Sequence, residues 1–222
     1  MTDLPFPVLP EHAKKVTSSE LVRPGPLNDL LTRGLDLLIT IPLLLLISPV
    51  LIGIGLIIRL TSPGPALYLQ DRTGRGGRVF RVYKFRTMTA EASRGRFVQA
   101  VRADPRVTRL GALLRRTSVD ELPQLLNVIT GDMSLVGPRP HPVDLDAAFA
   151  PQIPGYEDRF PVRPGITGLA QVRGHRGVTE TVGAMAARVE SDREYVRRAG
   201  PLMNLRILLQ TATVVLFQKN AF

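Results

Sequence analysis

The feature that most constrains this chain is an uncharged apolar run of 22 residues from Leu37 to Ile58. About 20 apolar residues in a helix are enough to cross the hydrocarbon core of a bilayer. The run begins too far from residue 1 for a secretory signal, and it is followed by Arg59 rather than by the small residues of a cleavage site. We therefore expect a membrane helix at about 33–59 that the mature protein retains.

Ser48 and Pro49 lie near the middle of this run and predict a bend. Proline has no N–H for the carbonyl four residues earlier, and its ring crowds that carbonyl. In hydrocarbon the freed carbonyl needs another donor, which the Ser48 hydroxyl can supply. Two arms of about 11 residues would each reach only about 16 Å, roughly half a membrane. The residues alone allow a kinked spanning helix, favoured on general grounds, or a re-entrant helix that leaves by the face it entered.

The chain is basic, with 29 Lys and Arg against 19 Asp and Glu and a formal net charge of +10. Such an excess attracts nucleic acid, anionic lipid headgroups or phosphorylated substrates, and composition does not choose among them. Much of it lies in the stretch 72–86, which by the positive-inside rule stays in the cytoplasm. The chain has no Cys, which excludes disulfides and thiolate metal sites.

The remaining pattern predicts an α+β fold that is mostly helical. Residues 1–28 are polar and contain several prolines, so we expect a loosely structured lead-in to a folded unit at 29–222. Residues 66–70 and 79–85 are rich in aromatic and β-branched side chains and flank a glycine-rich loop, which indicates a small β-hairpin.

Three later segments have the pattern of amphipathic or surface helices. Leucines recur at helical spacing among arginines near residues 110–114, which is typical of a basic helix in the headgroup plane. Residues 184–199 predict a charged helix that ends before Gly200 and Pro201. Residues 205–217 are mostly apolar but too short to span, so we expect a buried or interfacial helix.

The adjacent carboxylates Asp120 and Glu121 follow the basic helix and precede an apolar run. One interpretation is structural, because Ser118 and Glu121 fit a capping box, which stabilises a helix N-terminus. Pro123 argues against that register, since proline at the fifth helical position would lose an interior hydrogen bond; a helix that starts at Asp120 avoids this loss. Spacing alone favours the cap.

The functional interpretation uses the same geometry. A carboxylate at a helix N-terminus lies in a positive field, which Arg115 and Arg116 would reinforce, so we expect it to stay ionised. An ionised Asp120 can attack phosphorus and form an aspartyl-phosphate. Glu121 can hold Mg²⁺, which needs only one or two carboxylates when phosphate oxygens complete its shell.

Two turns, at 137–140 and 162–165, each place an arginine among prolines and glycines. Arg139 and Arg163 are therefore candidates for rigid, bidentate phosphate clamps. For each of them the alternative is a surface arginine that happens to follow a turn.

Seven segments in order, between Arg33 and Phe217, resemble the bacterial sugar transferase family, the monotopic polyprenyl-phosphate phosphoglycosyl transferases. They are Arg-Gly-Leu-Asp at 33–36, Ser-Pro at 48–49, Tyr-Lys-Phe-Arg-Thr-Met at 83–88, Asp-Pro-Arg-Val-Thr at 104–108, and the segments 118–124, 131–140 and 163–168. Each alone is a weak signal, whereas seven in order within one short chain are a strong one.

The resemblance implies a ping-pong reaction that spacing could not show. Asp120 matches the nucleophile that attacks the β-phosphorus of a UDP-sugar, expels UMP and carries the sugar phosphate covalently. Glu121 matches the Mg²⁺ ligand, and Arg115 and Arg139 match residues that bind substrate phosphates. Polyprenyl phosphate, usually undecaprenyl phosphate, then attacks the intermediate, which is the first membrane step of exopolysaccharide or glycoconjugate synthesis.

Lys84, Arg86 and Arg163 lie in matched motifs and are candidates for nucleotide or substrate binding. Ser48-Pro49 matches the helix break of the family and so implies a re-entrant helix. Residues 29–222 would then be a minimal catalytic domain on the cytoplasmic face of the bacterial inner membrane.

The implied partners are a UDP-sugar, polyprenyl phosphate and membrane lipids, without nucleic acid, and a homo-oligomer stays open. Thr32 and the segment 169–174 depart from the usual residues of the family, which leaves the sugar unidentified.

Two other functions account for part of the pattern. A membrane-tethered nucleic-acid-binding protein would use the basic stretch 72–86, with Phe80, Tyr83 and Phe85 as stacking groups. A structural adaptor at the membrane surface would need no chemistry. Both leave the carboxylate pair without a role, so the transferase is the leading interpretation.

Overall fold

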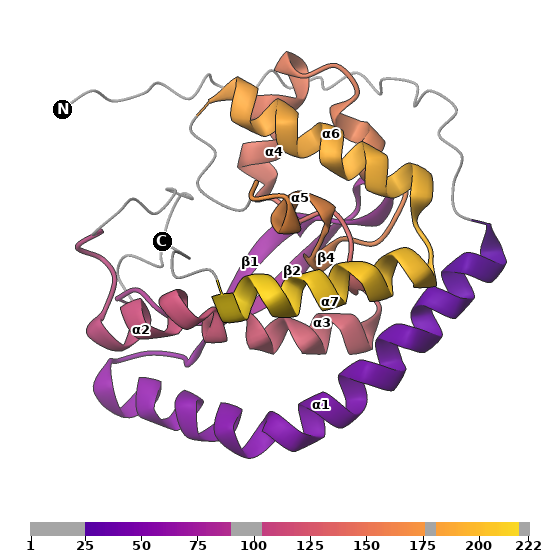
Figure 1. Cartoon of the computed structure of the whole chain (residues 1–222). Coiled ribbons are helices and arrows are strands. Elements are labelled where there is room, and N and C mark those ends of the chain that lie inside the picture. Colours follow the sequence, from indigo (N-terminus) through magenta and orange to yellow (C-terminus); the bar gives the residue numbers. More distant parts are fainter. Residues whose placement is uncertain (1–24, 90–103, 176–180, 218–222) are drawn as a thin grey trace.

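The helix α1 (Pro26–Thr61) is the first element of the computed structural model, which describes residues 25–89, 104–175 and 181–217 (Figure 1). It begins at Pro26 rather than near residue 33, because proline fits the first helical turn, where its missing N–H needs no partner. Residues 26–28, expected in the lead-in, therefore belong to α1. Residues 1–24 lie outside the described residues.

α1 is bent into two arms that run beneath the rest of the molecule in Figure 1. Pro49 lies inside the helix and cannot donate to the carbonyl of Leu45, four residues earlier. The Ser48 hydroxyl donates to that carbonyl instead, at 2.9 Å. The hydrogen bond expected from the sequence is confirmed, and it lets the helix bend without leaving a bare carbonyl.

The predicted hairpin is also confirmed, with β1 (Leu67–Thr73) antiparallel to β2 (Val79–Phe85). The connection turns through Gly76 at a φ of 66°, which glycine adopts without a steric cost. β1 continues past the predicted end at residue 70. At its end the Thr73 N–H donates to the carbonyl of His141 at 3.3 Å, so a distant segment extends the pairing.

The basic helix α2 (Arg109–Thr117) and the apolar helix α3 (Leu125–Thr130) are joined by the 3-10 helix η2 (Val119–Gln124). Ser118 ends α2 in the left-handed conformation at a φ of 58°, and its side chain makes no capping hydrogen bond to η2. The capping box favoured by the spacing is therefore wrong, because Ser118 closes one helix instead of opening the next.

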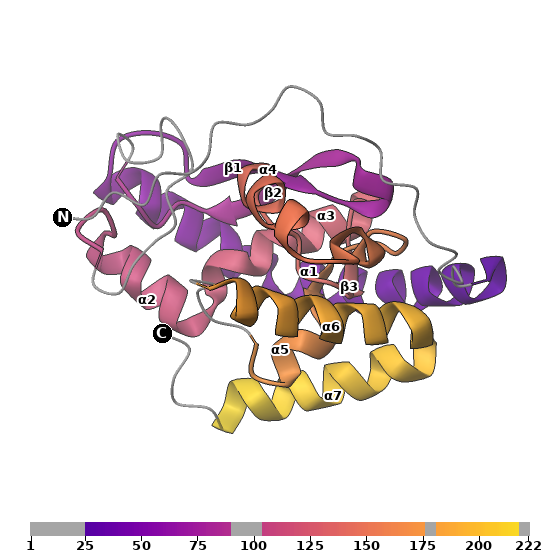
Figure 2. The ribbon, with the colours of Figure 1, turned by 90° about the horizontal axis from the view of Figure 1, so that it is seen from above.

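The second half of the chain builds a small parallel sheet and several helices. The sheet pairs β3 (Ser134–Val136) with β4 (Gly165–Thr167). The helices are α4 (Val143–Phe149), η3 (Ala150–Gln152), η4 (Tyr156–Arg159), α5 (Leu169–Val172), α6 (Val182–Arg198) and α7 (Pro201–Phe217), and the short η1 (Arg75–Gly77) lies in the hairpin turn. α6 agrees with its prediction, whereas α7 begins at Pro201 rather than near residue 205. Figure 2 shows the hairpin and α7 on opposite sides of the molecule.

The main hydrophobic core lies between the hairpin and the C-terminal helices. Its most deeply buried members, at 0–1% exposure, are Val82, Val128, Met133, Val136 and Ile207. These residues come from β2, α3, the β3 region and α7, so elements far apart in the sequence share one core. The predicted class, α+β and mostly helical, is confirmed.

Both arms of α1 are attached to this folded unit. In the first arm Asp36 is buried and accepts hydrogen bonds from the Ser134 hydroxyl and the Leu135 N–H, each at 3.0 Å. In the second arm Ile58 is buried in a cluster with Phe85. The helix is thus held near both ends by the same globular part.

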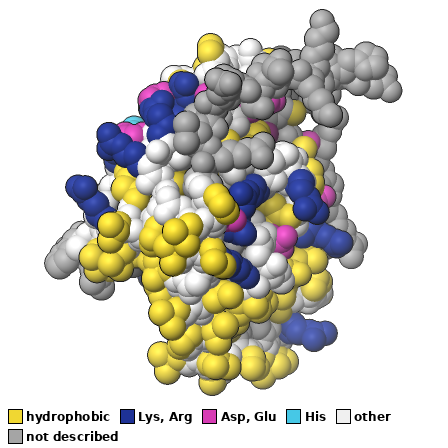
Figure 3. Space-filling view, turned by 90° about the vertical axis from the view of Figure 1, so that its right-hand side faces the viewer, with side chains coloured by type: hydrophobic (Ala, Val, Ile, Leu, Met, Phe, Trp, Pro, Cys, Tyr) yellow, Lys and Arg dark blue, Asp and Glu magenta, His cyan; other side chains and the backbone are white. Residues whose placement is uncertain are grey.

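The outer face of α1 is apolar and exposed. Figure 3 shows hydrophobic side chains over the lower part of the molecule, where α1 lies in Figure 1. Among the described residues α1 is the one helix long and apolar enough to cross a membrane, with a mean hydropathy of 2.7 in its most apolar window and only 6% of that window buried. The most exposed apolar side chains on α1, at 71–78%, are Leu38, Leu45, Leu46, Ile52 and Leu60. Such a face is suited to lipid rather than to water.

Candidate active site

The predicted carboxylate pair lies on η2, directly after the turn at Ser118. Lys84 near the end of β2 contacts Glu121, and so does Arg139, which comes from the turn that follows β3. Three of the predicted site residues therefore meet, although they come from segments that are distant in the sequence.

Glu121 is held by two cations. Its Oε1 accepts from the Lys84 ammonium at 2.8 Å, and the Arg139 guanidinium donates to both carboxylate oxygens at 2.5 and 3.1 Å. Burial by itself would raise the pKa of Glu121, but Arg139 and Lys84 outweigh it and hold the pKa well below the usual range. Glu121 is therefore a fixed, ionised carboxylate.

Asp120 differs from its neighbour, because no described residue donates a hydrogen bond to its carboxylate. Burial and the negative charge of Glu121 raise the pKa of Asp120 to about 6, against the opposing charges of Lys84, Arg115 and Arg139. We expected a helix N-terminus to keep this group strongly ionised, but burial is the larger effect. The carboxylate is still mostly ionised at neutral pH, and its oxygens are free to react.

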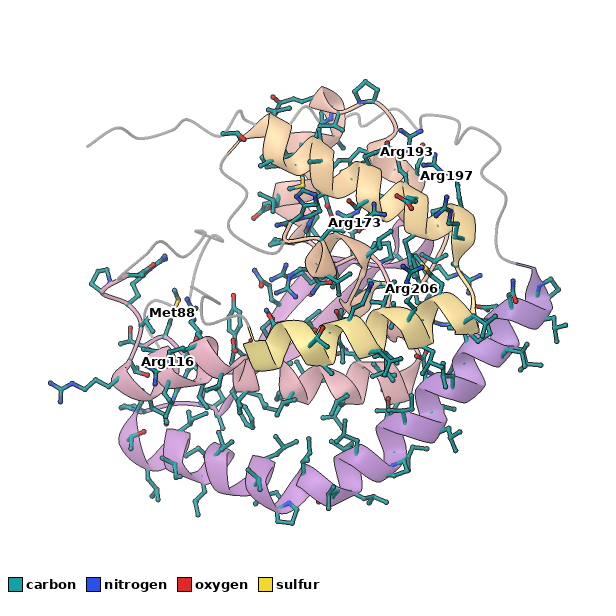
Figure 4. All side chains as sticks on the ribbon, viewed as in Figure 1. Met88, Arg116, Arg173, Arg193, Arg197 and Arg206 are labelled. Atoms are coloured by element: carbon teal, nitrogen blue, oxygen red, sulfur yellow. The ribbon has the colours of Figure 1, made fainter. Side chains whose placement is uncertain are left out.

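Arg115 and Arg116 adopt different positions, although they are adjacent at the end of α2. The Arg115 Nε donates to the Thr87 hydroxyl at 2.8 Å, and the positive charge of Arg115 lowers the pKa of Asp120. Arg116 extends away from the molecule in Figure 4. Only Arg115 can therefore contribute to a phosphate site beside the dyad.

A Mg²⁺ site at this dyad fits the donor set if a substrate completes it. A carboxylate offers about four lone-pair positions, and three of those on Glu121 already accept from Lys84 and Arg139. One position on Oε2 and both oxygens of Asp120 remain. In the described part of the chain no group of three or more His, Asp or Glu could hold a metal. The ion would thus need phosphate oxygens, which is how Mg²⁺ is commonly bound.

Two of the candidate substrate-binding residues lie elsewhere. Arg86 is buried and donates to the carbonyls of Ser62 and Pro63, so it fastens the end of α1. Arg163 pairs with Asp29, near the start of α1, at 2.8 Å. Among the described residues, neither guanidinium forms a hydrogen bond or ion pair with the dyad. Both motifs therefore serve the attachment of α1 in this structure.

The basic stretch 72–86 is less available than its sequence indicates. Lys84 is engaged by Glu121, Arg86 is 4% exposed, and Phe85, proposed as a stacking group, is 5% exposed. Arg72 donates to the carbonyl of Pro140. A nucleic-acid surface in this stretch is thus not favoured, because several of its side chains point into the fold.

Sequence reasoning missed two residues that support this site, Arg72 and Arg159. Arg72 lies at the end of β1 and contacts the turn that carries Arg139. Arg159, on η4, is 2% exposed and donates to the backbone carbonyl of Arg139. The basic stretch gave a weak signal for Arg72, and nothing in the sequence pattern pointed to Arg159.

Comparisons with known proteins show which family and which relatives this chain resembles. Residues 27–218 match the model of a family described as bacterial sugar transferase. A UDP-glucose:undecaprenyl-phosphate glucose-1-phosphate transferase of Caulobacter vibrioides is 48% identical over 206 residues, which are 90% of this chain and 77% of that protein.

Two further relatives differ in length. A UDP-glucose:undecaprenyl-phosphate glucose-1-phosphate transferase of Escherichia coli is 46% identical over 88% of this chain but only 42% of its own length. An exopolysaccharide production protein PSS of Rhizobium leguminosarum is 43% identical over 86% of this chain and 98% of that protein. The chain thus spans less than half of the Escherichia coli relative and nearly all of the Rhizobium one.

Proposed function

This chain belongs to the bacterial sugar transferase family, and we propose that it transfers a sugar 1-phosphate from a UDP-sugar to undecaprenyl phosphate and releases UMP. Relatives named for UDP-glucose make glucose the first donor to test. A relative of Aeromonas hydrophila named for N-acetylgalactosamine, 38% identical, makes that sugar the second.

The observation that carries this proposal is the contrast between two adjacent carboxylates. Asp120 has no hydrogen bond from a described residue, whereas Glu121 is fixed by Lys84 and Arg139. A nucleophile needs free lone pairs, which the lack of donors leaves on Asp120, and an ionised form near neutral pH, which a pKa of about 6 allows. A structural pair would be expected to have both members hydrogen-bonded.

In the proposed reaction an oxygen of Asp120 attacks the β-phosphorus of the UDP-sugar. The bond from that phosphorus to the bridging oxygen breaks, and UMP leaves with the electron pair. An oxygen of undecaprenyl phosphate then attacks the same phosphorus, which restores the Asp120 carboxylate and gives the polyprenyl-diphosphate sugar. Arg115 and Arg139 would hold substrate phosphates during both steps.

We include Mg²⁺ as the cofactor, held by the remaining oxygen position of Glu121, by Asp120 and by substrate phosphates. When bound, it would offset the negative charge that builds up on the leaving phosphate. Lys84 would keep Glu121 oriented, since it donates to the carboxylate oxygen opposite the open position.

We further propose that α1 is re-entrant in the bacterial inner membrane, with the site on the cytoplasmic face. The support is that Asp36 and Ile58, in different arms, are both buried against the same globular part. A straight spanning helix would carry its two ends to opposite faces. The exposed outer face of the bent helix would then contact lipid.

UMP release from a panel of UDP-sugars tests the proposal, with membranes that contain wild-type protein or Asp120→Asn, plus Mg²⁺ and undecaprenyl phosphate. We expect one sugar to give acceptor-dependent UMP that requires Asp120 and disappears with EDTA. A single-turnover assay should also give one UMP per Asp120 without acceptor. If folded, membrane-bound protein releases no UMP from any sugar, the adaptor interpretation gains support.

A further inference from the structure

The turn that carries Arg139 is held along its whole backbone. Its two prolines, Pro138 and Pro140, have no N–H, so these two residues can be held only through their carbonyls and rings. Each of the four successive carbonyls accepts one hydrogen bond. The pairs are Gly165 N–H to Pro138 at 2.9 Å, Arg159 Nη2 to Arg139 at 2.6 Å, Arg72 Nη1 to Pro140 at 2.9 Å, and Thr73 N–H to His141 at 3.3 Å.

Two of these four donors are guanidinium groups from different elements. Arg72 reaches the turn from the end of β1, and Arg159 reaches it from η4. Hydrogen bonds from charged donors are shorter and stronger than neutral ones. Both guanidinium groups thus bind carbonyls that follow the Arg139 Cα, and the Gly165 N–H binds the Pro138 carbonyl that precedes it.

Arg159 is itself anchored by a buried ion pair. Its Nη2 lies 2.8 Å from the Asp192 carboxylate on α6, and the two side chains are 2% and 1% exposed. Its Nη1 contacts His141 Nδ1 at 2.5 Å and the Tyr156 hydroxyl at 3.4 Å. This network leaves the guanidinium little freedom, so the carbonyl of Arg139 has a fixed partner.

Arg72 has no such counter-ion. It donates to Gln70 Oε1 at 2.6 Å as well as to Pro140, and among the described residues no carboxylate lies within ion-pair distance of it. Burial and the positive charge of Arg139 lower the pKa of Arg72 to about 10, so it stays charged at neutral pH. Holding Arg72 close to Arg139 without a direct carboxylate partner for Arg72 costs free energy.

We propose that Arg72 and Arg159 are positioning residues, which hold the backbone of Arg139 so that its guanidinium stays on Glu121. The inference rests on the proposed function, because it assigns these side chains to the geometry of the same site. They would act through Arg139, not through contact with the reacting atoms. A displacement of Arg139 by a fraction of an ångström would then loosen the carboxylate and the phosphate site together.

A double-mutant cycle tests this, with Arg72→Met and Arg159→Lys made in wild type and in Arg139→Lys. We expect kcat for UMP release to fall roughly 10- to 100-fold in wild type, with KM for the UDP-sugar changed by less than about threefold. In Arg139→Lys the same substitutions should cost at most about twofold more, because residues that act through one group are not additive.

Arg193→Met is the matched control. Arg193 on α6, labelled in Figure 4, pairs with Asp158, next to Arg159, at 3.0 Å. Its ion pairs are with Asp158 and Glu190 and not with Arg139, so kcat should stay within about twofold of wild type. Thermal unfolding of every variant would be recorded in parallel. Arg72→Met leaves no carboxylate unpaired, so it decides the question if Arg159→Lys does not fold.

Three results would overturn the inference. The first is an equal loss of kcat in both backgrounds, which would mean that Arg72 and Arg159 act independently of Arg139. The second is a raised KM with unchanged kcat, which would indicate direct substrate binding. The third is activity equal to that of the control. A wild-type protein that releases no UMP would instead refute the proposed function, so the two failures are distinguishable.

Discussion

Asp120 has no hydrogen-bond donor among the described residues, because Lys84 and Arg139 both bind its neighbour Glu121 and Arg115 donates to Thr87. The pKa values of the two carboxylates differ, because burial dominates for Asp120 whereas Lys84 and Arg139 dominate for Glu121. This difference predicts how the reaction responds to pH. A group whose pKa is raised by burial loses its charge at a higher pH than usual.

We expect the first half-reaction to slow as the pH falls through about 6, because the raised pKa of Asp120 means that the nucleophile becomes protonated there. The ionised fraction is about 90% at pH 7 and about 10% at pH 5 for one group with this pKa. Single-turnover UMP release without acceptor measures this limb free of the titration of the acceptor phosphate.

Lys84→Met should move that limb to higher pH, since the charge of Lys84 lowers the pKa of Asp120. Arg78→Met, at an exposed position of the hairpin turn, is the control and should leave the midpoint unchanged. An unchanged midpoint in Lys84→Met would show that another group controls the limb.

Glu121→Gln tests the assigned metal ligand. The amide keeps the volume but removes the charge and one oxygen, so we expect the Mg²⁺ concentration for half-maximal UMP release to rise about tenfold or more. Asp132→Asn removes an exposed carboxylate outside the site and should not change it. Equal Mg²⁺ dependence in Glu121→Gln and wild type would contradict the role of Glu121.

Sequence patterns pointed to the carboxylate pair of this candidate site more clearly than to the residues that support it. Asp120 and Glu121 stand out because adjacent carboxylates beside arginines are unusual. Lys84 and Arg86 looked alike, but only Lys84 reaches the dyad, since Arg86 turns to carbonyls at the end of α1. Which partner a cation finds depends on the tertiary fold, and no local pattern encodes it.

At the scale of elements, the short helix α2 is placed by a close backbone approach. A Cβ on Gly111 would lie 2.0 Å from the carbonyl oxygen of Thr87, and the Thr87 hydroxyl accepts from Arg115. The helix, the strand end and one side of the active site are therefore coupled at this contact. The sequence predicted the helix and not the contact, because a glycine inside a helical pattern has several explanations.

Gly111→Ala should therefore separate α2 from the segment at Thr87. We expect a loss of about 1–3 kcal/mol in unfolding free energy, because backbone atoms must move to relieve the overlap. UMP release should fall as well, since Arg115 moves with α2. Gly183→Ala is the matched control, because a Cβ at Gly183 in α6 meets nothing within 4 Å and alanine is the better helix former. Equal unfolding midpoints for the two variants would contradict the argument.

The predicted helix boundary at Ser118 was wrong, and the reason is its backbone conformation. Ser118 fits a helix start by its spacing, yet it adopts a left-handed φ and ends α2. Ser48 was predicted correctly because the donor and the freed carbonyl lie in the same turn. Short-range hydrogen bonds can be derived from sequence, whereas the choice between two neighbouring helix boundaries depends on packing.

At the scale of the whole molecule, α1 combines an exposed apolar face with contacts to the part of the chain that carries the dyad. Arg33 donates to the carbonyls of Val128 and Ile129 at the end of α3, and Asp29 pairs with Arg75 and Arg163. These partners are far apart in sequence, so the attachment of the first arm could not be predicted. The apolar run itself was clear from composition.

This attachment makes the topology testable, because the chain contains no Cys. We expect a single engineered cysteine, Ser19→Cys, to be protected from an impermeant thiol reagent in intact cells, since a re-entrant helix keeps both ends in the cytoplasm. Pro49→Leu restores the missing N–H and favours a straight helix. In the variant that carries both Ser19→Cys and Pro49→Leu, the two arms of a straighter α1 can no longer both contact the globular part without strain. We therefore expect partial labelling there together with lower UMP release. Labelling of Ser19→Cys alone, in active protein, would establish a spanning helix and refute the re-entrant one.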